Sequence, residues 1–253
     1  MSRKWKSLYR WSLRGLSAAG LCAGIWALSL GSSTPSEAFF DSYGTPAVMV
    51  KDAAILVVIG TGNPVSDHLA KEMVEPAAWT YESSAIFEID DFEDYAQYET
   101  KFLERLEQEL RSKSAVDIIV LRHTNSMDRT LAKVPAELRK KIRLVYNTGC
   151  TNAHGGDAYM KLGIGAYIGH PGISCSPVFV SLFKDRWLNG YSLKDAVKLA
   201  NDDLEADLMH GVLGDICKKA TSADSREEAF AATKAQLFGN TSLTIHARYR
   251  GSK

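Results

Sequence analysis

The sequence predicts an α/β protein in which a mostly parallel sheet is flanked by helices. Short apolar runs rich in β-branched residues occur at 54–59 (AILVVI), 116–121 (VDIIVL) and 142–146 (IRLVY), and such runs are typical of strands buried on both faces. Segments of helical character follow or separate these runs, as in βαβ units. About 215 residues remain after the N-terminal leader described below, which is enough for one sizeable core. We therefore expect a single domain.

The first strand, at 54–59, is followed by the turn Gly60-Thr61-Gly62-Asn63-Pro64. Its two glycines resemble the beginning of a dinucleotide-binding fingerprint. The third glycine is missing, so we expect no nucleotide cofactor. A helix from Ser66 to about Met73 follows the turn, and the alternating residues at 85–89 (AIFEI) predict a second strand.

Asp90 and Asp91 are expected to cap a long helix that runs from Phe92 to about Arg111. Apolar residues at spacings of three and four line one side of this helix, and glutamates cover the other side. The elements after it are predicted, in chain order, as a strand at 116–121, a short helix at 135–141, a strand at 142–146, a short helix ending near 163, a strand at 166–169, helices at 177–188 and 193–209, a helix at 227–237 and a terminal strand at 242–248.

The first 38 residues are predicted to be an export signal. Five basic residues precede an apolar stretch at 16–30, and Ser36-Glu37-Ala38 forms a small-x-small cleavage site. The mature chain would begin at Phe39 and be periplasmic or secreted, with 39–53 as a linker or initial strand and 54–250 as the α/β domain. The apolar stretch has about 15 residues, fewer than a spanning helix needs, so a membrane anchor is expected only if cleavage fails.

The charge balance disfavours nucleic acid as a partner. The chain has 30 basic and 30 acidic residues, and loss of the leader leaves 25 basic against 29 acidic residues. The mature protein is therefore mildly acidic. No basic block remains that would bind a phosphate backbone.

Two predicted strands lead into residues that are suited to nucleophilic catalysis. His123 follows the run at 116–121, and Cys150 follows the run at 142–146. Because the carboxyl ends of parallel strands meet at one edge of a sheet, the two side chains are expected to lie close together. A histidine within hydrogen-bond reach can take the proton of a thiol and make it a nucleophile. The alternative is a small buried cysteine and a polar strand terminus.

The cysteine count is compatible with a free nucleophile. Cys22 lies in the leader, so the mature chain keeps Cys150, Cys175 and Cys217 in a compartment that permits disulfides. An odd number leaves at least one cysteine unpaired. If Cys175 and Cys217 pair, Cys150 is the free thiol; in the alternative, all three are reduced and buried.

Other polar residues are given structural roles. His154 and Asp157 could form a metal site with Cys150, but no second cysteine or histidine pair has zinc-site spacing, so no metal is expected. His170 is predicted to lie in a turn at the rim of the site. Asp117 is predicted to face solvent at the start of its strand. A serine hydrolase is disfavoured because the sequence has no G-x-S-x-G motif.

Four features occur in a characteristic order between 123 and 200: a strand followed by His123, a strand followed by Gly149-Cys150, the glycine-framed strand in KLGIGAYIGHP, and the helical pair in FKDRWLNGYSLKDAVKLAN. In this order they resemble the caspase-like cysteine peptidases, and among these the CHAT-domain branch. The close resemblance covers about a third of the chain. It implies a caspase-like three-layer sandwich, with a mostly parallel central sheet flanked by helices.

The resemblance also implies a cysteine endopeptidase that acts on peptides or proteins, and with the predicted leader this would be an exported enzyme, for which we expect no cofactor or metal. His123 would be the general base, and Cys150 the nucleophile that forms a thioester intermediate. Backbone amides near the two strand ends would hold the oxyanion, with Thr124, Gly149 and Thr151 at this site and its rim. The family usually has glycine in place of Thr124 and often has alanine in place of Gly149.

Two other functions stay open at this point. The first is a binding or regulatory module that keeps the caspase-like fold but has no turnover. The second is an unrelated exported α/β protein in which a histidine and a cysteine follow two strands by chance.

Overall fold

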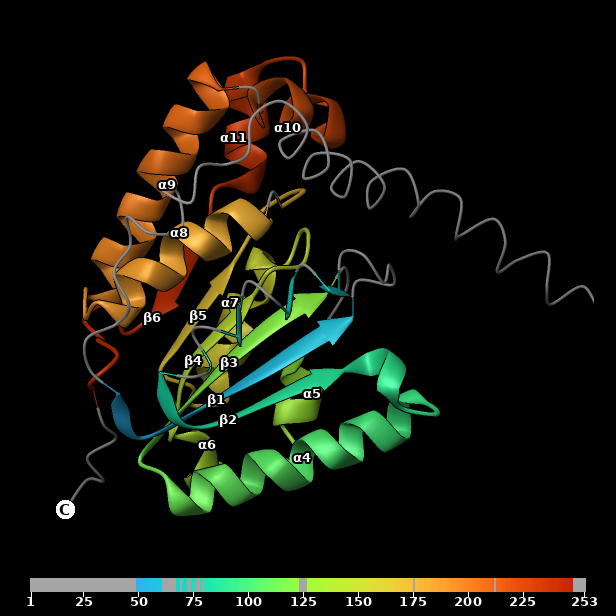
Figure 1. Ribbon diagram of the computed structural model, residues 1–253, viewed down its shortest axis with the longest axis vertical. Coiled ribbons are helices and arrows are strands. Elements are labelled where there is room, and N and C mark those ends of the chain that lie inside the picture. The colour runs from blue at the N-terminus through green and yellow to red at the C-terminus, as the bar shows by residue number, and fades with distance from the viewer. Residues whose placement is uncertain are drawn as a thin grey trace, which may run out of the picture.

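The computed structural model describes residues 49–60, 67–68, 70–71, 74–75, 78, 80–122, 127–174, 176–211 and 213–247. Six strands form one sheet in the order β2-β1-β3-β4-β5-β6, and helices lie on both sides of it (Figure 1). The first five strands run parallel, and β6 is antiparallel to β5. The bounds are β1 (Val50–Gly60), β2 (Tyr81–Glu88), β3 (Ala115–Arg122), β4 (Ile142–Asn147), β5 (Ala166–Gly169) and β6 (Gln236–Gly239). The predicted α/β class is confirmed.

The helices separate into two layers. One core is shared by the sheet and the helices α4 (Tyr95–Ser112), α5 (Met127–Leu131), α6 (Ala136–Arg139) and α7 (Gly156–Lys161). The other core is shared by the opposite face and the helices α8 (Ser176–Leu188), α9 (Leu193–His210), α10 (Leu213–Thr221) and α11 (Arg226–Thr233). Short 3-10 helices precede α4 and α7, namely η1 (Ile89–Asp91) and η2 (Ala153–Gly155). The fold therefore has three layers.

Strand β3 shows why the strand sequences are almost continuously apolar. Ile118 and Val120 pack toward α4, whereas Ile119 and Leu121 pack into the core on the other face. Because side chains alternate along a strand and both faces of this sheet are covered, neither set can be polar without a buried partner.

The bounds of α4 differ from the prediction at its start. The helix begins at Tyr95, after Asp94, whose carboxylate accepts a hydrogen bond from the backbone N–H of Gln97. Asp90 and Asp91 lie in η1 instead. An aspartate caps a helix only where its backbone is extended and the free N–H groups follow it, and Asp94 meets both conditions.

The C-terminal elements were predicted wrongly in two places. The helix expected at 227–237 ends at Thr233, and the strand that follows is β6 rather than a segment at 242–248, whose described part forms turns. The side chain of Asn201 on α9 explains this change of direction. It donates to the carbonyl of Ala235 (3.0 Å) and accepts from its N–H (2.9 Å), which fixes the chain in an extended form before β6.

Asp117 is buried, so the prediction that it faces solvent was wrong. Its carboxylate accepts two hydrogen bonds from the guanidinium of Arg143, at 2.8 and 2.7 Å, and further ones from the hydroxyl of Tyr81 (2.5 Å) and the indole N–H of Trp187 (3.2 Å). Consecutive residues Val116 and Asp117 pair with Ile142 and Leu144, so Arg143 is the additional residue of a bulge in β4. A bulge re-aims a side chain, here toward Asp117.

The predicted signal at 1–38 and most of the linker at 39–53 lie outside the described residues, although β1 already begins at Val50. Within the described part of the chain, none of the helices combines the length and the apolar character that crossing a membrane requires.

Candidate functional site

Cys150 and its neighbours Gly149 and Thr151 are described, whereas His123, Thr124 and Cys175 lie outside the described residues. Strands β3 and β4 are parallel neighbours, with Val120 opposite Asn147. His123 directly follows the last residue of β3, and Cys150 follows the last residue of β4 by three positions. Both therefore follow strands that end at the same, carboxyl-terminal edge of the sheet.

Beyond Asn147 the chain stays in contact with β3. The N–H and the hydroxyl of Thr148 both donate to the carbonyl of Val120, at 2.9 and 3.0 Å. A Cβ atom on Gly149 would lie only 2.9 Å from the carbonyl oxygen of Arg122. Glycine is thus required at position 149, and the residue before Cys150 lies against the residue before His123.

Two asparagines hold the turn that carries Cys150. The side chain of Asn147 accepts from the N–H of Gly149 (3.0 Å), and Asn152 donates to the carbonyl of Asn147 (3.0 Å) while accepting from the N–H of His170 (2.8 Å). Sequence reasoning did not identify these residues. The signal available was their position, since Asn147 ends a strand and Asn152 lies in the loop before η2, and asparagine in such places often bonds to nearby backbone.

Thr151 has a left-handed backbone, with φ of +54°. This conformation is unfavourable for a β-branched residue and is kept only where the surroundings fix it. Here the N–H of Thr151 donates to the carbonyl of Gly172 (2.8 Å), and its hydroxyl to the carbonyl of Cys150 (2.8 Å).

Cys150 is a free thiol and is half-buried, whereas Cys217 is disulfide-bonded. The alternative in which all three cysteines are reduced is therefore wrong. The backbone N–H of Ser174 points to the sulfur of Cys150 at 3.5 Å, which is within hydrogen-bond range for a sulfur acceptor. The thiol is accessible and has one donor in place.

The amides at the predicted oxyanion site are unequally available. Those of Gly149 and Thr151 already donate, to Asn147 and Gly172 respectively. Among the described residues, none accepts a hydrogen bond from the N–H of Cys150. Of the three amides in this turn, that of Cys150 is the one without an acceptor among the described residues, and it can therefore serve an oxyanion.

His170 is fully buried, so the prediction that it lines the rim of the site was wrong. Its Nδ1–H donates to the carbonyl of Thr233 (2.6 Å), and its Nε2 then accepts from the hydroxyl of Tyr146 (3.2 Å). Burial raises the pKa of Tyr146 well above its usual value, so this hydroxyl keeps its proton. Burial lowers the pKa of His170 to about 4, so the imidazole is neutral at pH 7.

Acidification is expected to destabilise the fold through His170. In the unfolded chain the imidazole has a pKa of about 6.5, so between pH 6.5 and about 4 only the unfolded state takes up the proton. The stability that neutral His170 contributes to the folded state is complete above pH 6.5 and is lost as the pH falls through this window. The total loss in the free energy of unfolding is about 3 kcal/mol. Urea unfolding from pH 7 to pH 4 measures it. A His170→Gln variant should show a shallower fall over this range, and equal slopes would contradict the assignment.

The residues weighed as metal ligands do not form a cluster. His154 lies exposed on η2 and Asp157 is exposed at the start of α7. In the part of the chain that is described, no group of three or more His, Cys, Asp or Glu side chains is arranged to hold a metal ion.

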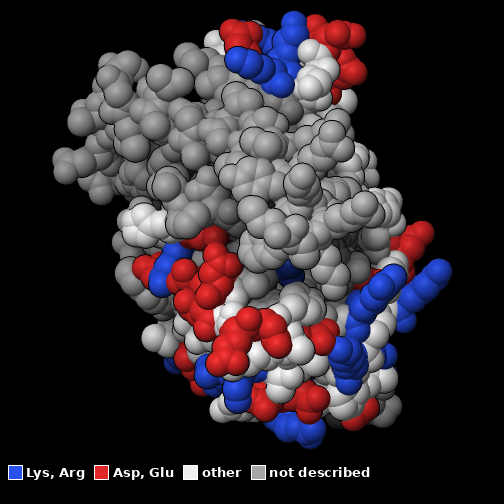
Figure 2. All heavy atoms as spheres, turned by 90° about the vertical axis from the view of Figure 1, so that its right-hand side faces the viewer, with Lys and Arg blue, Asp and Glu red and all other residues white. Residues whose placement is uncertain are grey.

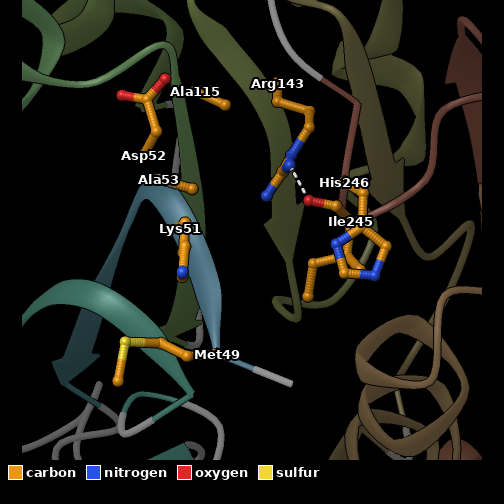
Figure 3. Close-up of a pocket in the computed structure, with 8 residues that line it drawn as sticks. All are labelled: Met49, Lys51, Asp52, Ala53, Ala115, Arg143, Ile245 and His246. Atoms are coloured by element: carbon orange, nitrogen blue, oxygen red, sulfur yellow. Dashed lines mark hydrogen bonds between the residues drawn. The ribbon is translucent and has the colours of Figure 1, made fainter. Parts of the chain in front are cut away.

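A cavity of about 170 Å³ lies at the opposite, amino-terminal edge of the sheet (Figure 3). Figure 3 shows the guanidinium of Arg143 on one side of it, bonded to the carbonyl of Ile245, and Lys51 and Met49 on the other side. Because Arg143 also binds Asp117, its donors are largely engaged by the protein itself. The cavity is separate from Cys150.

Acidic side chains gather at the carboxyl-terminal edge, over the end of β2 and the start of α4 (Figure 2). Four of them are exposed, namely Asp90, Asp91, Glu93 and Asp94. Arg122, the last residue of β3, lies over the ring of Tyr95 at 5.5 Å from its centre. The edge that carries the candidate site is thus flanked by negative charge.

No model of a known protein family matches the chain, and no curated protein matches it either.

Proposed function

We propose that the chain is an exported cysteine endopeptidase of caspase-like fold, in which His123 and Cys150 form the catalytic pair. The observation that carries this proposal is the placement of Cys150. Cys150 is a free, half-buried thiol in the turn that follows β4 at the carboxyl-terminal edge of the sheet. It comes directly after Gly149, which lies against the carbonyl of Arg122. His123 is the next residue after Arg122.

The reaction follows from these groups. His123 takes the thiol proton, and the sulfur of Cys150 forms a bond to the peptide carbonyl carbon, whose oxygen becomes negative and accepts a hydrogen bond from the N–H of Cys150. The C–N bond then breaks, and the amine leaves with the proton from His123. Water, deprotonated by His123, attacks the resulting thioester, the C–S bond breaks, and the thiol is regenerated with the acid product.

The surface charge favours cationic substrates. The exposed carboxylates of η1 and the residues just before α4 create a negative potential along the carboxyl-terminal edge of the sheet, two strands from β3, which raises the local concentration of positive peptides and repels negative ones. A library that contains lysine- and arginine-rich peptides is therefore the appropriate set of test substrates.

Alkylation of Cys150 tests the catalytic pair. In the mature protein at pH 7, iodoacetamide is expected to modify Cys150 quickly, and His123→Ala to slow this about tenfold because the thiolate loses its partner. Mass spectrometry of the peptide containing Cys150 gives the rate. His154→Ala is the matched control, since His154 is an exposed histidine four residues from Cys150. Slow alkylation that is unaffected by His123→Ala would overturn the proposal and favour a binding module of the same fold.

A further inference from the structure

We propose that Ser174 stabilises the deprotonated form of Cys150, with its backbone N–H and its hydroxyl both donating to the sulfur. The proposal rests on the proposed function in taking Cys150 as the nucleophile. The first donor is already in place, at 3.5 Å from the sulfur. The second donor belongs to the same residue.

The hydroxyl of Ser174 has no evident structural purpose. The residue is only 6% exposed, and among the described residues its Oγ has no hydrogen-bond partner. A buried hydroxyl without a partner costs free energy, so such a group needs an explanation. A neutral thiol is a weak acceptor, whereas a thiolate is a strong one. A serine hydroxyl can rotate toward the sulfur when the charge forms.

The segment that carries Ser174 is fixed relative to Cys150. The N–H of Thr151 donates to the carbonyl of Gly172, and the N–H of Ala153 to that of His170, at 2.8 and 3.0 Å. Gly172 in turn donates to the carbonyl of Ala232 on α11 (2.7 Å), and a Cβ on Gly172 would lie 2.8 Å from that of Ala232. The donors therefore need little rearrangement when the sulfur becomes negative.

Removal of the hydroxyl has a distinctive expected effect. The alkylation rate rises with pH to a plateau. Loss of one charge-assisted hydrogen bond is expected to move the midpoint of this rise to a higher pH, by about one pH unit. A more basic thiolate is also more nucleophilic, with a Brønsted coefficient of about 0.4–0.5. In Ser174→Ala, the rate at pH 7 is thus expected to fall about threefold, while the plateau at high pH rises about threefold. A purely structural disturbance would not lower the alkylation rate at pH 7 and raise the plateau at high pH at the same time.

The test is the alkylation of Cys150 by iodoacetamide in the mature protein between pH 5 and 10. Ser174→Ala is compared with Ser174→Thr, which keeps the hydroxyl and should retain the original profile, and with Ser83→Ala, which removes a hydroxyl on the edge strand β2. Because the lost hydroxyl has no partner, Ser174→Ala should unfold at no lower urea concentration than the parent. If it does not fold, Ser174→Gly replaces it.

The outcomes separate the two proposals, because alkylation requires no peptide substrate. A shifted profile without any peptide hydrolysis supports the role of Ser174 and overturns the proposed function. The role of Ser174 is overturned, even if peptides are cleaved, by an unchanged profile. It is also overturned if the rate at pH 7 and the plateau at high pH change in the same direction.

Discussion

Cys150→Ala is expected to abolish peptide hydrolysis without unfolding the protein. Alanine removes the attacking sulfur from a half-buried position, and the N–H of Ser174 loses only a weak, 3.5 Å hydrogen bond to sulfur, so the fold should persist. His123→Ala should have a comparable effect, a loss of kcat/KM on the order of 10⁴-fold, because the thiol and its base act as a unit. The double variant should therefore be little worse than either single one.

Kinetics on a peptide library, with far- and near-UV circular dichroism to confirm folding, give the comparison. His154→Ala again serves as the control for loss of a nearby histidine and should keep full activity. If the two single substitutions at His123 and Cys150 leave turnover unchanged, the proposal that these residues form a catalytic pair is wrong.

Asp117→Asn is expected to destabilise the fold by about 3–5 kcal/mol, the range found when one partner of a buried ion pair is removed. Arg143 is 5% exposed, and in this variant its charge would have no buried counter-charge at Asp117. Tyr81 and Trp187 would also lose their carboxylate acceptor. Burial, followed by the charge of Asp117, holds the pKa of Tyr81 well above its usual value, so Tyr81 stays a donor.

The free energy of unfolding in urea at pH 7 measures this effect. Asp90→Asn is a suitable control because Asp90 is exposed, and it should change stability by less than about 0.5 kcal/mol. Asp117→Asn combined with Arg143→Met should recover much of the loss, since the double variant buries no uncompensated charge. A loss below about 1 kcal/mol in Asp117→Asn would show that the ion pair between Asp117 and Arg143 does not stabilise the fold.

The strands were the most predictable part of the fold, because a buried strand is recognised from a short apolar run of consecutive residues. The strand predicted at 166–169 has the bounds of β5, where Gly165 and Gly169 frame the run. Asp117 shows the limit of such reasoning. Its partners Arg143 and Trp187 are 26 and 70 positions away in the sequence, so local pattern cannot tell a buried ion pair from an exposed carboxylate.

The pairing of the two strands that precede His123 and Cys150 was predictable from the sequence, but the contacts around Cys150 were not. Strands β3 and β4, which end before His123 and Cys150, are parallel neighbours, as the sequence indicates. Ser174 and His170 belong to a segment about 20 residues later, and its approach to Cys150 depends on the turn at Thr151 and on α11. Such tertiary contacts leave no periodic trace in the sequence.

The bulge at Arg143 has a consequence for how this protein can evolve. Arg143 binds Asp117 at the amino-terminal end of β3 and β4, and about 13 Å of strand separate it from Asn147, where the turn to Cys150 begins. The ion pair that anchors the two strands is thus remote from the thiol they present. A substitution in the turn would leave the other end of the same strands in register, so the turn, apart from constrained residues such as Gly149, can change during evolution without loss of the sheet.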